Sequence, residues 1–132
     1  MADLMKGTVV KISGPVVDVR FDGKMPPINS LLTVEKYNKH LEVALHLEQG
    51  VVRSVALEAT EGLCCGLSVV SDGKGIEVPV GDAVVGRVVD VLGRPIDGKG
   101  EIKSDEKWAI HRKAPLLSEQ KPATEILETG IK

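Results

Sequence analysis

Three sets of residues have types and spacings that could carry chemistry: a glycine-rich loop, two neighbouring cysteines and three histidines. The loop from Gly93 to Gly100 fits the pattern G-x-x-x-x-G-K of a phosphate-binding loop. However, Gly100 stands where such a loop needs serine or threonine to hold magnesium. The residues that follow begin no apolar-faced helix whose N-terminus could bind phosphate. We therefore interpret this loop as a surface hairpin.

The neighbouring cysteines, Cys64 and Cys65, are of a type that can act as a redox pair or bind a soft metal ion. A disulfide between adjacent residues is strained, and no third ligand lies nearby in the sequence. A redox enzyme based on Cys64 would need a thiol of lowered pKa. The simpler interpretation is that two small residues occupy a tight turn between Gly62 and Gly66.

The histidines, His40, His46 and His111, show no metal-binding spacing. His46 falls on the polar face of an alternating segment, so we expect it to be solvated or hydrogen-bonded. His111 begins the basic cluster His111-Arg112-Lys113 beside Trp108, where a phosphate or nucleic-acid contact is conceivable. Because the net charge is −2, we interpret the cluster as a contact between domains or subunits.

Neither sequence motifs nor composition indicate an active site. The serines lie in no G-x-S-x-G nucleophile elbow, and the acidic residues form no evident pair. We therefore assign no catalytic, cofactor-binding or metal-binding residue. With 17 basic and 19 acidic residues, the chain lacks the charge of a duplex-DNA binder, and no apolar run approaches the roughly 18 residues of a membrane span. We expect a soluble protein.

The elements that position these residues are short β-strands. All 19 valines lie between Val9 and Val91, and β-branched residues favour strands. Alternating segments separated by turns such as Gly14-Pro15, Asp22-Gly23 and Gln49-Gly50 predict antiparallel strands joined by hairpins. The predicted strands are residues 8–13, 17–21, 41–48, 51–57, 67–70 and, as an edge strand because of Pro79, 76–80.

About six strands in 80 residues predict a small closed barrel or a sandwich, because too few residues remain for parallel crossovers. A further strand is expected at 86–92, and a short helix at 122–129. Residues 81–132 contain too little apolar surface to form a core of their own. We interpret them as the front edge of a second domain.

Read in order, the loops and strand ends resemble the catalytic β subunits of the F-type ATP synthases, within the rotary ATPase α/β family. The similarity covers essentially the whole chain. The strings that carry it are Gly14 to Val19, Leu41 to Leu47, Val52 to Leu57, Thr60 to Leu63, Val78 to Gly81, Gly86 to Val88, Gly93 to Asp97, Ile110 to Pro115 and Glu125 to Lys132. The chain departs from the family at Cys64-Cys65, where an aliphatic residue and an arginine are common.

The resemblance implies a mainly β fold: a six-stranded antiparallel closed barrel over residues 1–79, then the incomplete start of an α/β nucleotide-binding domain over residues 80–132. It implies that the barrel joins α and β subunits in an alternating α3β3 hexamer around a central stalk. In the family, ATP or ADP and magnesium bind beyond a Thr-Gly-Ile-Lys string like residues 129–132. We therefore expect no active site and no cofactor in this chain.

Further expectations follow from the resemblance. The parent protein would make ATP with a proton gradient, peripherally bound at the cytoplasmic face of a bacterial cell membrane. The chain would be an N-terminal fragment that binds no nucleic acid. Because of exposed barrel edges and an apolar rim, we expect it to be partly self-associating or only marginally stable. The alternative is a free-standing small barrel that binds an oligonucleotide or a protein. Only three aromatic residues are present to stack on bases.

Overall fold

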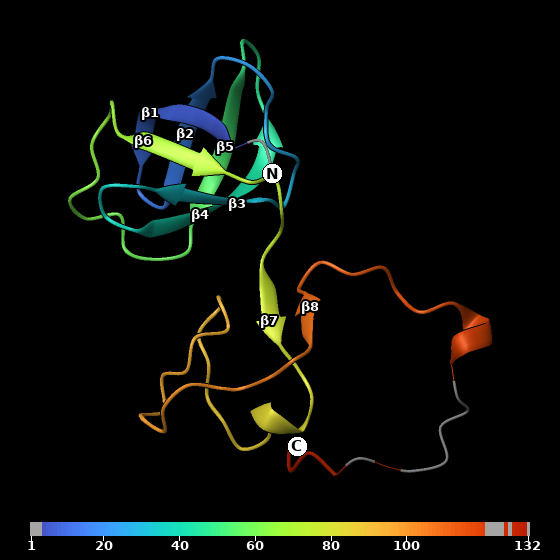
Figure 1. Ribbon diagram of the computed structural model, residues 1–132. Helices are drawn as coiled ribbons and strands as arrows, with labels where there is room; N and C mark the ends of the chain where they lie inside the picture. The colour runs from blue at the N-terminus through green and yellow to red at the C-terminus, as the bar shows by residue number, and fades with distance from the viewer. Residues whose placement is uncertain (1–3, 121–125, 127, 132) are drawn as a thin grey trace.

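The computed structural model describes residues 4–120, 126 and 128–131, in which six strands close into a barrel (Figure 1). The barrel strands are β1 (Met5–Ser13), β2 (Val16–Phe21), β3 (Leu31–Val34), β4 (Lys39–His46), β5 (Val51–Ala56) and β6 (Ser68–Ser71). They follow one another around the barrel in the order β1-β2-β5-β4-β3-β6, and all neighbours are antiparallel. Closure pairs β6 with β1, so the predicted antiparallel barrel is confirmed.

Aliphatic residues from every barrel strand fill the core. Because side chains alternate along a strand, each strand contributes every second residue to the interior. Leu32, Leu41 and Val52 are among the side chains with no solvent exposure. Burial of each such side chain contributes roughly 1.5–3 kcal/mol. The remaining core members are Val9, Val17, Val19, Phe21, Val34, Val43, Leu67 and Val69.

Two of the expected hairpins form, and each depends on a glycine. Gly14-Pro15 joins β1 to β2 in a two-residue loop, with Gly14 at a φ of 59°. Gly50, at a φ of 73°, lies in the turn between β4 and β5. Its carbonyl accepts a 2.9 Å hydrogen bond from the Phe21 amide. A Cβ at Gly50 would lie 2.8 Å from the Phe21 carbonyl oxygen, so this position requires glycine.

Two expectations about the barrel strands are wrong. Asp22-Gly23 forms no hairpin, because the chain after β2 crosses to β3, which pairs with β4 and β6. Strand β3 was not predicted, because Leu31–Val34 has only four residues and shows weak alternation. β3 is thus the sixth strand of the barrel. A strand does form within the predicted range 76–80, but it lies outside the barrel. Since the barrel is closed, its strands also lack the exposed edges expected to drive self-association.

The chain leaves the barrel through β7 (Glu77–Pro79), which pairs with β8 (Lys107–Ala109) in a separate two-stranded sheet. The other described elements are the 3-10 turns η1 (Asp82–Val84) and η2 (Leu117–Glu119). No strand forms over 86–92: Val89 makes only an isolated bridge to Pro95, because the chain turns back on itself there. The helix expected at 122–129 falls mostly outside the described residues.

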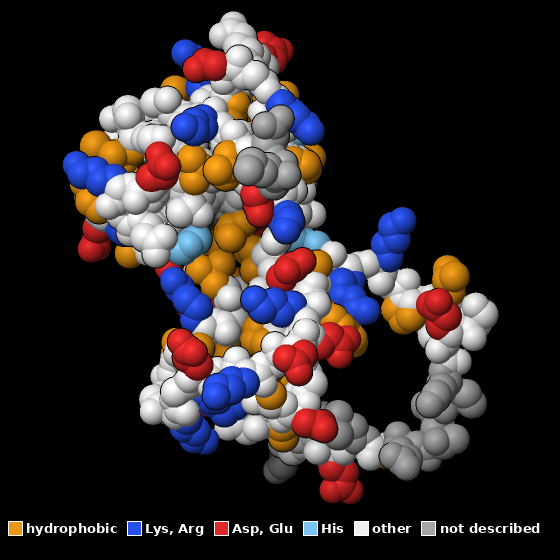
Figure 2. Space-filling view, in the orientation of Figure 1, with side chains coloured by type: hydrophobic (Ala, Val, Ile, Leu, Met, Phe, Trp, Pro, Cys, Tyr) orange, Lys and Arg blue, Asp and Glu red, His pale blue; other side chains and the backbone are white. Residues whose placement is uncertain are grey.

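The segment from residue 77 onward has no core among its described residues. None of them is buried, whereas the barrel has a continuous buried interior. Figure 2 shows apolar side chains on the surface of this segment and where it meets the barrel. The expectation that this segment buries little apolar surface is therefore confirmed for the part that the structure describes. In that part, no helix is long and apolar enough to cross a membrane.

Candidate functional site

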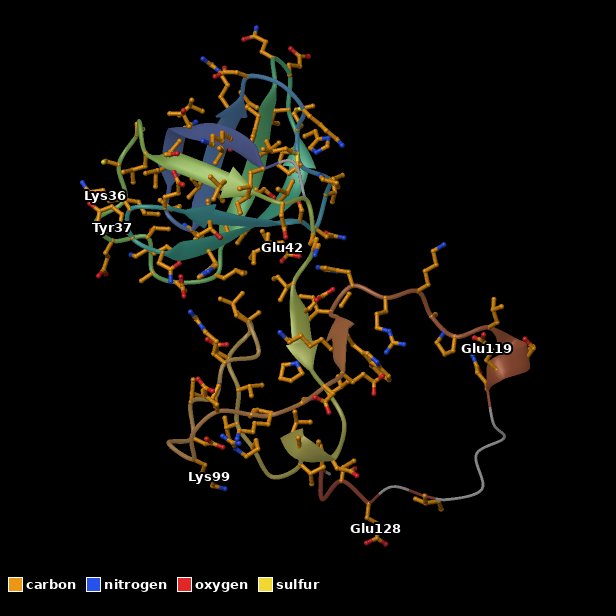
Figure 3. All side chains as sticks on the ribbon, in the orientation of Figure 1. Lys36, Tyr37, Glu42, Lys99, Glu119 and Glu128 are labelled. Atoms are coloured by element: carbon orange, nitrogen blue, oxygen red, sulfur yellow. The ribbon has the colours of Figure 1, made fainter. Side chains whose placement is uncertain are left out.

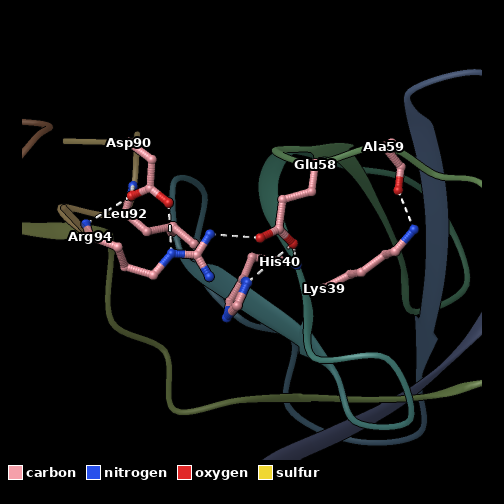
Figure 4. Close-up of polar contacts among 7 residues, drawn as sticks. All are labelled: Lys39, His40, Glu58, Ala59, Asp90, Leu92 and Arg94. Atoms are coloured by element: carbon pink, nitrogen blue, oxygen red, sulfur yellow. Dashed lines mark hydrogen bonds and ion pairs between the residues drawn. The ribbon is translucent and has the colours of Figure 1, made fainter. Parts of the chain in front are cut away.

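The polar centre of the junction between the barrel and the following segment is Glu58, just after β5 (Figure 4). Its Oε1 accepts a 2.7 Å hydrogen bond from Nη2 of Arg94. Its Oε2 accepts bonds from the backbone N–H of His40 at 3.0 Å and from the His40 ring at 3.4 Å. Burial alone would raise the pKa of Glu58, but these donors hold it below its ordinary value. Glu58 thus links the barrel to the glycine-rich loop.

Arg94 is held in place by a hairpin turn that starts at Asp90. The Asp90 amide donates to the Arg94 carbonyl at 2.8 Å, and the Gly93 amide donates to the Asp90 carbonyl at 2.9 Å. The Asp90 carboxylate accepts from the Arg94 amide at 2.8 Å and from Arg94 Nε at 2.6 Å. The surface-hairpin interpretation is therefore confirmed for this part of the loop. Arg94 of this hairpin contacts the barrel through its hydrogen bond to Glu58.

The rest of the glycine-rich loop is held by Arg87 and Asp97. Arg87 donates to both Asp97 oxygens, from Nε at 2.6 Å and from Nη2 at 3.0 Å. Asp97 also accepts from the amides of Val88 and Lys99, at 3.2 and 3.0 Å. The Arg87 guanidinium, helped by these amides, holds the pKa of Asp97 far below its ordinary value. The Lys99 amide, which a phosphate loop would offer to its ligand, is thus already used.

Lys99 itself is not placed as a phosphate-binding lysine. Figure 3 shows it at the end of the segment that lies away from the barrel. Its ammonium group donates to the Gly86 carbonyl at 3.3 Å, and its side chain lies on an exposed turn. A phosphate loop needs its lysine and a set of backbone amides to face one ligand. In this loop, the Lys99 amide donates to the Asp97 carboxylate, while the Lys99 ammonium group donates to the Gly86 carbonyl.

A second contact between the barrel and the segment joins Glu42 of β4 to His111. The His111 ring is hydrogen-bonded to Oε1 of Glu42, on the side of the barrel that faces the segment (Figure 3). Next to His111, the Arg112 guanidinium lies 3.7 Å from the centre of the Trp108 ring, a cation–π contact. The basic cluster therefore makes an internal contact between two parts of the chain, in agreement with one of its two predicted roles.

The other sequence candidates are His46 and the two cysteines. His46 is hydrogen-bonded through Nε2 to the Pro26 carbonyl at 2.8 Å, as expected for its polar face. Cys64 and Cys65 are exposed free thiols in the turn between Gly62 and Gly66, both of which have positive φ. Among the residues that the structure describes, no group of three histidine, cysteine or acidic side chains could hold a metal ion.

Sequence reasoning missed a pair on the barrel exterior, Asp18 of β2 and Arg53 of β5. The two residues are partners in the strand register. Arg53 donates to both carboxylate oxygens of Asp18, at 2.8 and 2.9 Å. The guanidinium lowers the pKa of Asp18, outweighing the effect of burial. No local signal could identify this pair, because 35 residues separate its members in the sequence.

The segment after the barrel exposes many large apolar side chains. Val85 is 77% exposed, Ile96 63% and Leu117 86%. Others on the described part are Val88, Val89, Val91, Trp108, Ile110, Leu116, Ile126 and Ile131. So much apolar surface on so few residues is typical of a face that further protein covers. The arrangement is a closed barrel, joined by charged contacts to a segment without its own core.

These features define a class of protein: a chain with a small closed β-barrel, followed by a segment that has no buried residue in the part that the structure describes. Residues 9–73 match the family described as "ATP synthase alpha/beta family, beta-barrel domain". The match includes the whole of strands β2 to β6 and most of β1. The barrel of this chain is therefore similar to the β-barrel domain of the ATP synthase alpha/beta family.

The Glu58 contact predicts an acid-sensitive junction. Because the folded-state pKa of Glu58 is lowered, its contribution to stability is present above its ordinary pKa of about 4.3 and is lost as the pH falls through the folded value. Glu58→Gln should therefore speed amide exchange at Gly93 and Arg94 near neutral pH by a factor of about 2 to 5, as expected for a partly exposed ion pair. Two-dimensional NMR measures this.

The matched control for the junction is Glu61→Gln, in the same loop. Glu61 is exposed, and its carboxylate makes no hydrogen bond to the residues that the structure describes. This control should leave exchange at Gly93 and Arg94 unchanged. If both variants behave alike, Glu58 does not join the barrel to the loop.

Proposed function

We propose that this chain is the barrel and the beginning of the nucleotide-binding domain of an F-type ATP synthase catalytic β subunit. The observation that carries the proposal is the closed barrel with its family match over residues 9–73. The resemblance of two strings, Leu41 to Leu47 and Ile110 to Ala114, favours a β subunit over an α subunit. The exposed apolar residues of the segment support it, because a complete nucleotide-binding domain would cover them.

The proposed role of the barrel is to assemble α and β subunits into an alternating α3β3 ring. A closed barrel suits this role because it presents a rigid outer surface without free strand edges. Ion pairs such as Asp18–Arg53 hold charges on that surface in fixed positions. Leu45 and Val55, about 40% exposed on β4 and β5, offer apolar contact area. Neighbouring barrels would bury such residues.

The proposed parent enzyme makes ATP from ADP and phosphate by a rotary mechanism, driven by a proton gradient and attached to the cytoplasmic side of a bacterial membrane. ATP or ADP and magnesium would be held by residues of the parent beyond Lys132. The residues described in this chain would not contact the nucleotide; their proposed roles are assembly and positioning. The barrel holds the subunit in the ring, and Glu58 and Glu42 position the segment that leads to the nucleotide site.

Nucleotide binding gives a direct test of this division of roles. We expect the 132-residue chain neither to hydrolyse ATP nor to bind Mg-ATP at micromolar concentration, because the Lys99 amide of its phosphate-loop-like segment already donates to the Asp97 carboxylate. Equilibrium dialysis with labelled ATP measures binding, and a complete F-type β subunit is the positive control. Micromolar binding by the 132-residue chain would contradict the proposal. Binding of a single-stranded oligonucleotide at low salt would instead support a free-standing barrel.

A further inference from the structure

The turn that contains Cys64 and Cys65 lies between β5 and β6 and has no role in the interactions described so far. Both cysteines are exposed free thiols, so neither is needed to fill the barrel core. The turn is bracketed by Gly62 at a φ of 82° and Gly66 at a φ of 89°. Two adjacent reduced thiols therefore face solvent at one fixed position on the barrel.

Hydrogen bonds to β1 hold the base of this turn. The Gly66 amide donates to the Val9 carbonyl at 2.8 Å, and the Val9 amide donates to the Leu67 carbonyl at 3.0 Å. The Cys65 thiol lies 3.4 Å from the Val10 carbonyl oxygen and donates a weak bond to it. The backbone on the C-terminal side of the pair is thus fixed to the barrel. Cys64 is the next residue toward the N-terminus from Cys65, the thiol that bonds to β1.

The chemistry of adjacent thiols favours one class of ligand. A disulfide would require the two sulfurs to approach to about 2.05 Å, which strains the ring formed by neighbouring residues. An atom inserted between the sulfurs removes this requirement, because each sulfur then bonds to the inserted atom. That atom must be soft, since thiolates prefer soft partners. It must also accept two ligands at a narrow angle, which suits a pyramidal trivalent arsenic centre.

We propose that Cys64 and Cys65 form a dithiol site for trivalent arsenicals of the type R–As=O. In the reaction, two S–H bonds and the As=O bond break, and two S–As bonds form. The two thiol protons leave with the oxygen as one molecule of water. Arsenic stays trivalent, so the reaction needs no oxidant or reductant. The inserted arsenic closes a ring across the turn and covers the exposed sulfurs.

The probe that tests this site is phenylarsine oxide, applied to the full 132-residue chain under reducing-agent-free conditions. After removal of unbound reagent by gel filtration, intact-mass spectrometry should show one arsenical per chain. An excess of 2,3-dimercaptopropanol should release it, because this small dithiol competes for the same two bonds. The variants Cys64→Ser and Cys65→Ser each keep only one thiol. Each variant should retain less arsenical than the native chain by a factor of about ten or more.

Both variants change exposed side chains, so we expect them to fold, and circular dichroism verifies this. Failure of the native chain to retain phenylarsine oxide would overturn the proposal. Equal retention by either single variant would also overturn it, because one thiol would then suffice. Alkylation of the native chain with iodoacetamide before the arsenical serves as a chemical control and should abolish retention. The test is independent of the proposed role in ATP synthase.

Discussion

Replacement of Gly7 by alanine should lower the free energy of unfolding of the barrel by about 1–3 kcal/mol, the usual cost of overpacking a filled core. Gly7 is buried in β1, where it pairs with Phe21 of β2 and Val69 of β6. A Cβ there would lie 2.8 Å from the Arg20 carbonyl oxygen and 2.9 Å from both the Phe21 ring and a Val19 methyl group. At least one of these contacts is with backbone, which cannot simply rotate away.

Urea denaturation followed by circular dichroism measures this loss as a lower transition midpoint. The matched control is Gly23→Ala, because a Cβ at Gly23 meets nothing within 4 Å and its backbone does not require glycine. The control should leave the midpoint nearly unchanged or raise it slightly. If Gly7→Ala is as stable as the native chain, β1 and β2 do not approach as closely as described.

Hydrogen exchange should divide the chain sharply at the end of the barrel. Amides in β1, β2 and β5 should exchange roughly a thousandfold more slowly than amides in residues 80–120, because local stability follows buried apolar contacts. The barrel strands enclose a continuous core, whereas no described residue after Ile76 is buried. NMR exchange measurements at neutral pH determine the ratio for each amide.

The same division predicts the behaviour of a shortened chain. A variant that ends at residue 76 keeps every barrel strand and should unfold at nearly the same urea concentration as the full chain. It loses the Arg94–Glu58 ion pair and the His111–Glu42 hydrogen bond, which are partly exposed contacts with small effects on stability. Equal protection of both parts of the full chain, or a shortened chain that fails to fold, would show that the segment belongs to the barrel core.

The fold could be predicted as far as local patterns determine it. Valine-rich alternation and the turns at Gly14-Pro15 and Gln49-Gly50 identified two hairpins of the barrel correctly. Alternation failed in β4, where the register shifts between Val43 and Leu45. This bulge leaves Leu45 42% exposed, although strict alternation places it inside with Leu41 and Val43. A bulge is set by the neighbouring strand, so a single strand's pattern does not reveal it.

The junction could be predicted only in part. The basic cluster at His111 indicated a contact between domains, and the loop at Arg94 indicated a hairpin. Their acidic partners were not predictable, because Glu42 and Glu58 lie 69 and 36 residues away in the sequence. Similarly, β7 and β8 pair across a polar stretch that showed no strand pattern at 107–109. Such pairings follow from the path of the chain after the barrel closes.

The measurement that most directly tests the proposed assembly role is competition in hexamer formation. The chain is mixed with the α subunits and the complete β subunits of an F-type ATP synthase, and the products are separated by native mass spectrometry. If the barrel is an assembly module, the chain will enter complexes with α subunits and reduce the yield of α3β3 as its concentration rises. A chain that remains unbound while the hexamer forms in full yield would contradict this account.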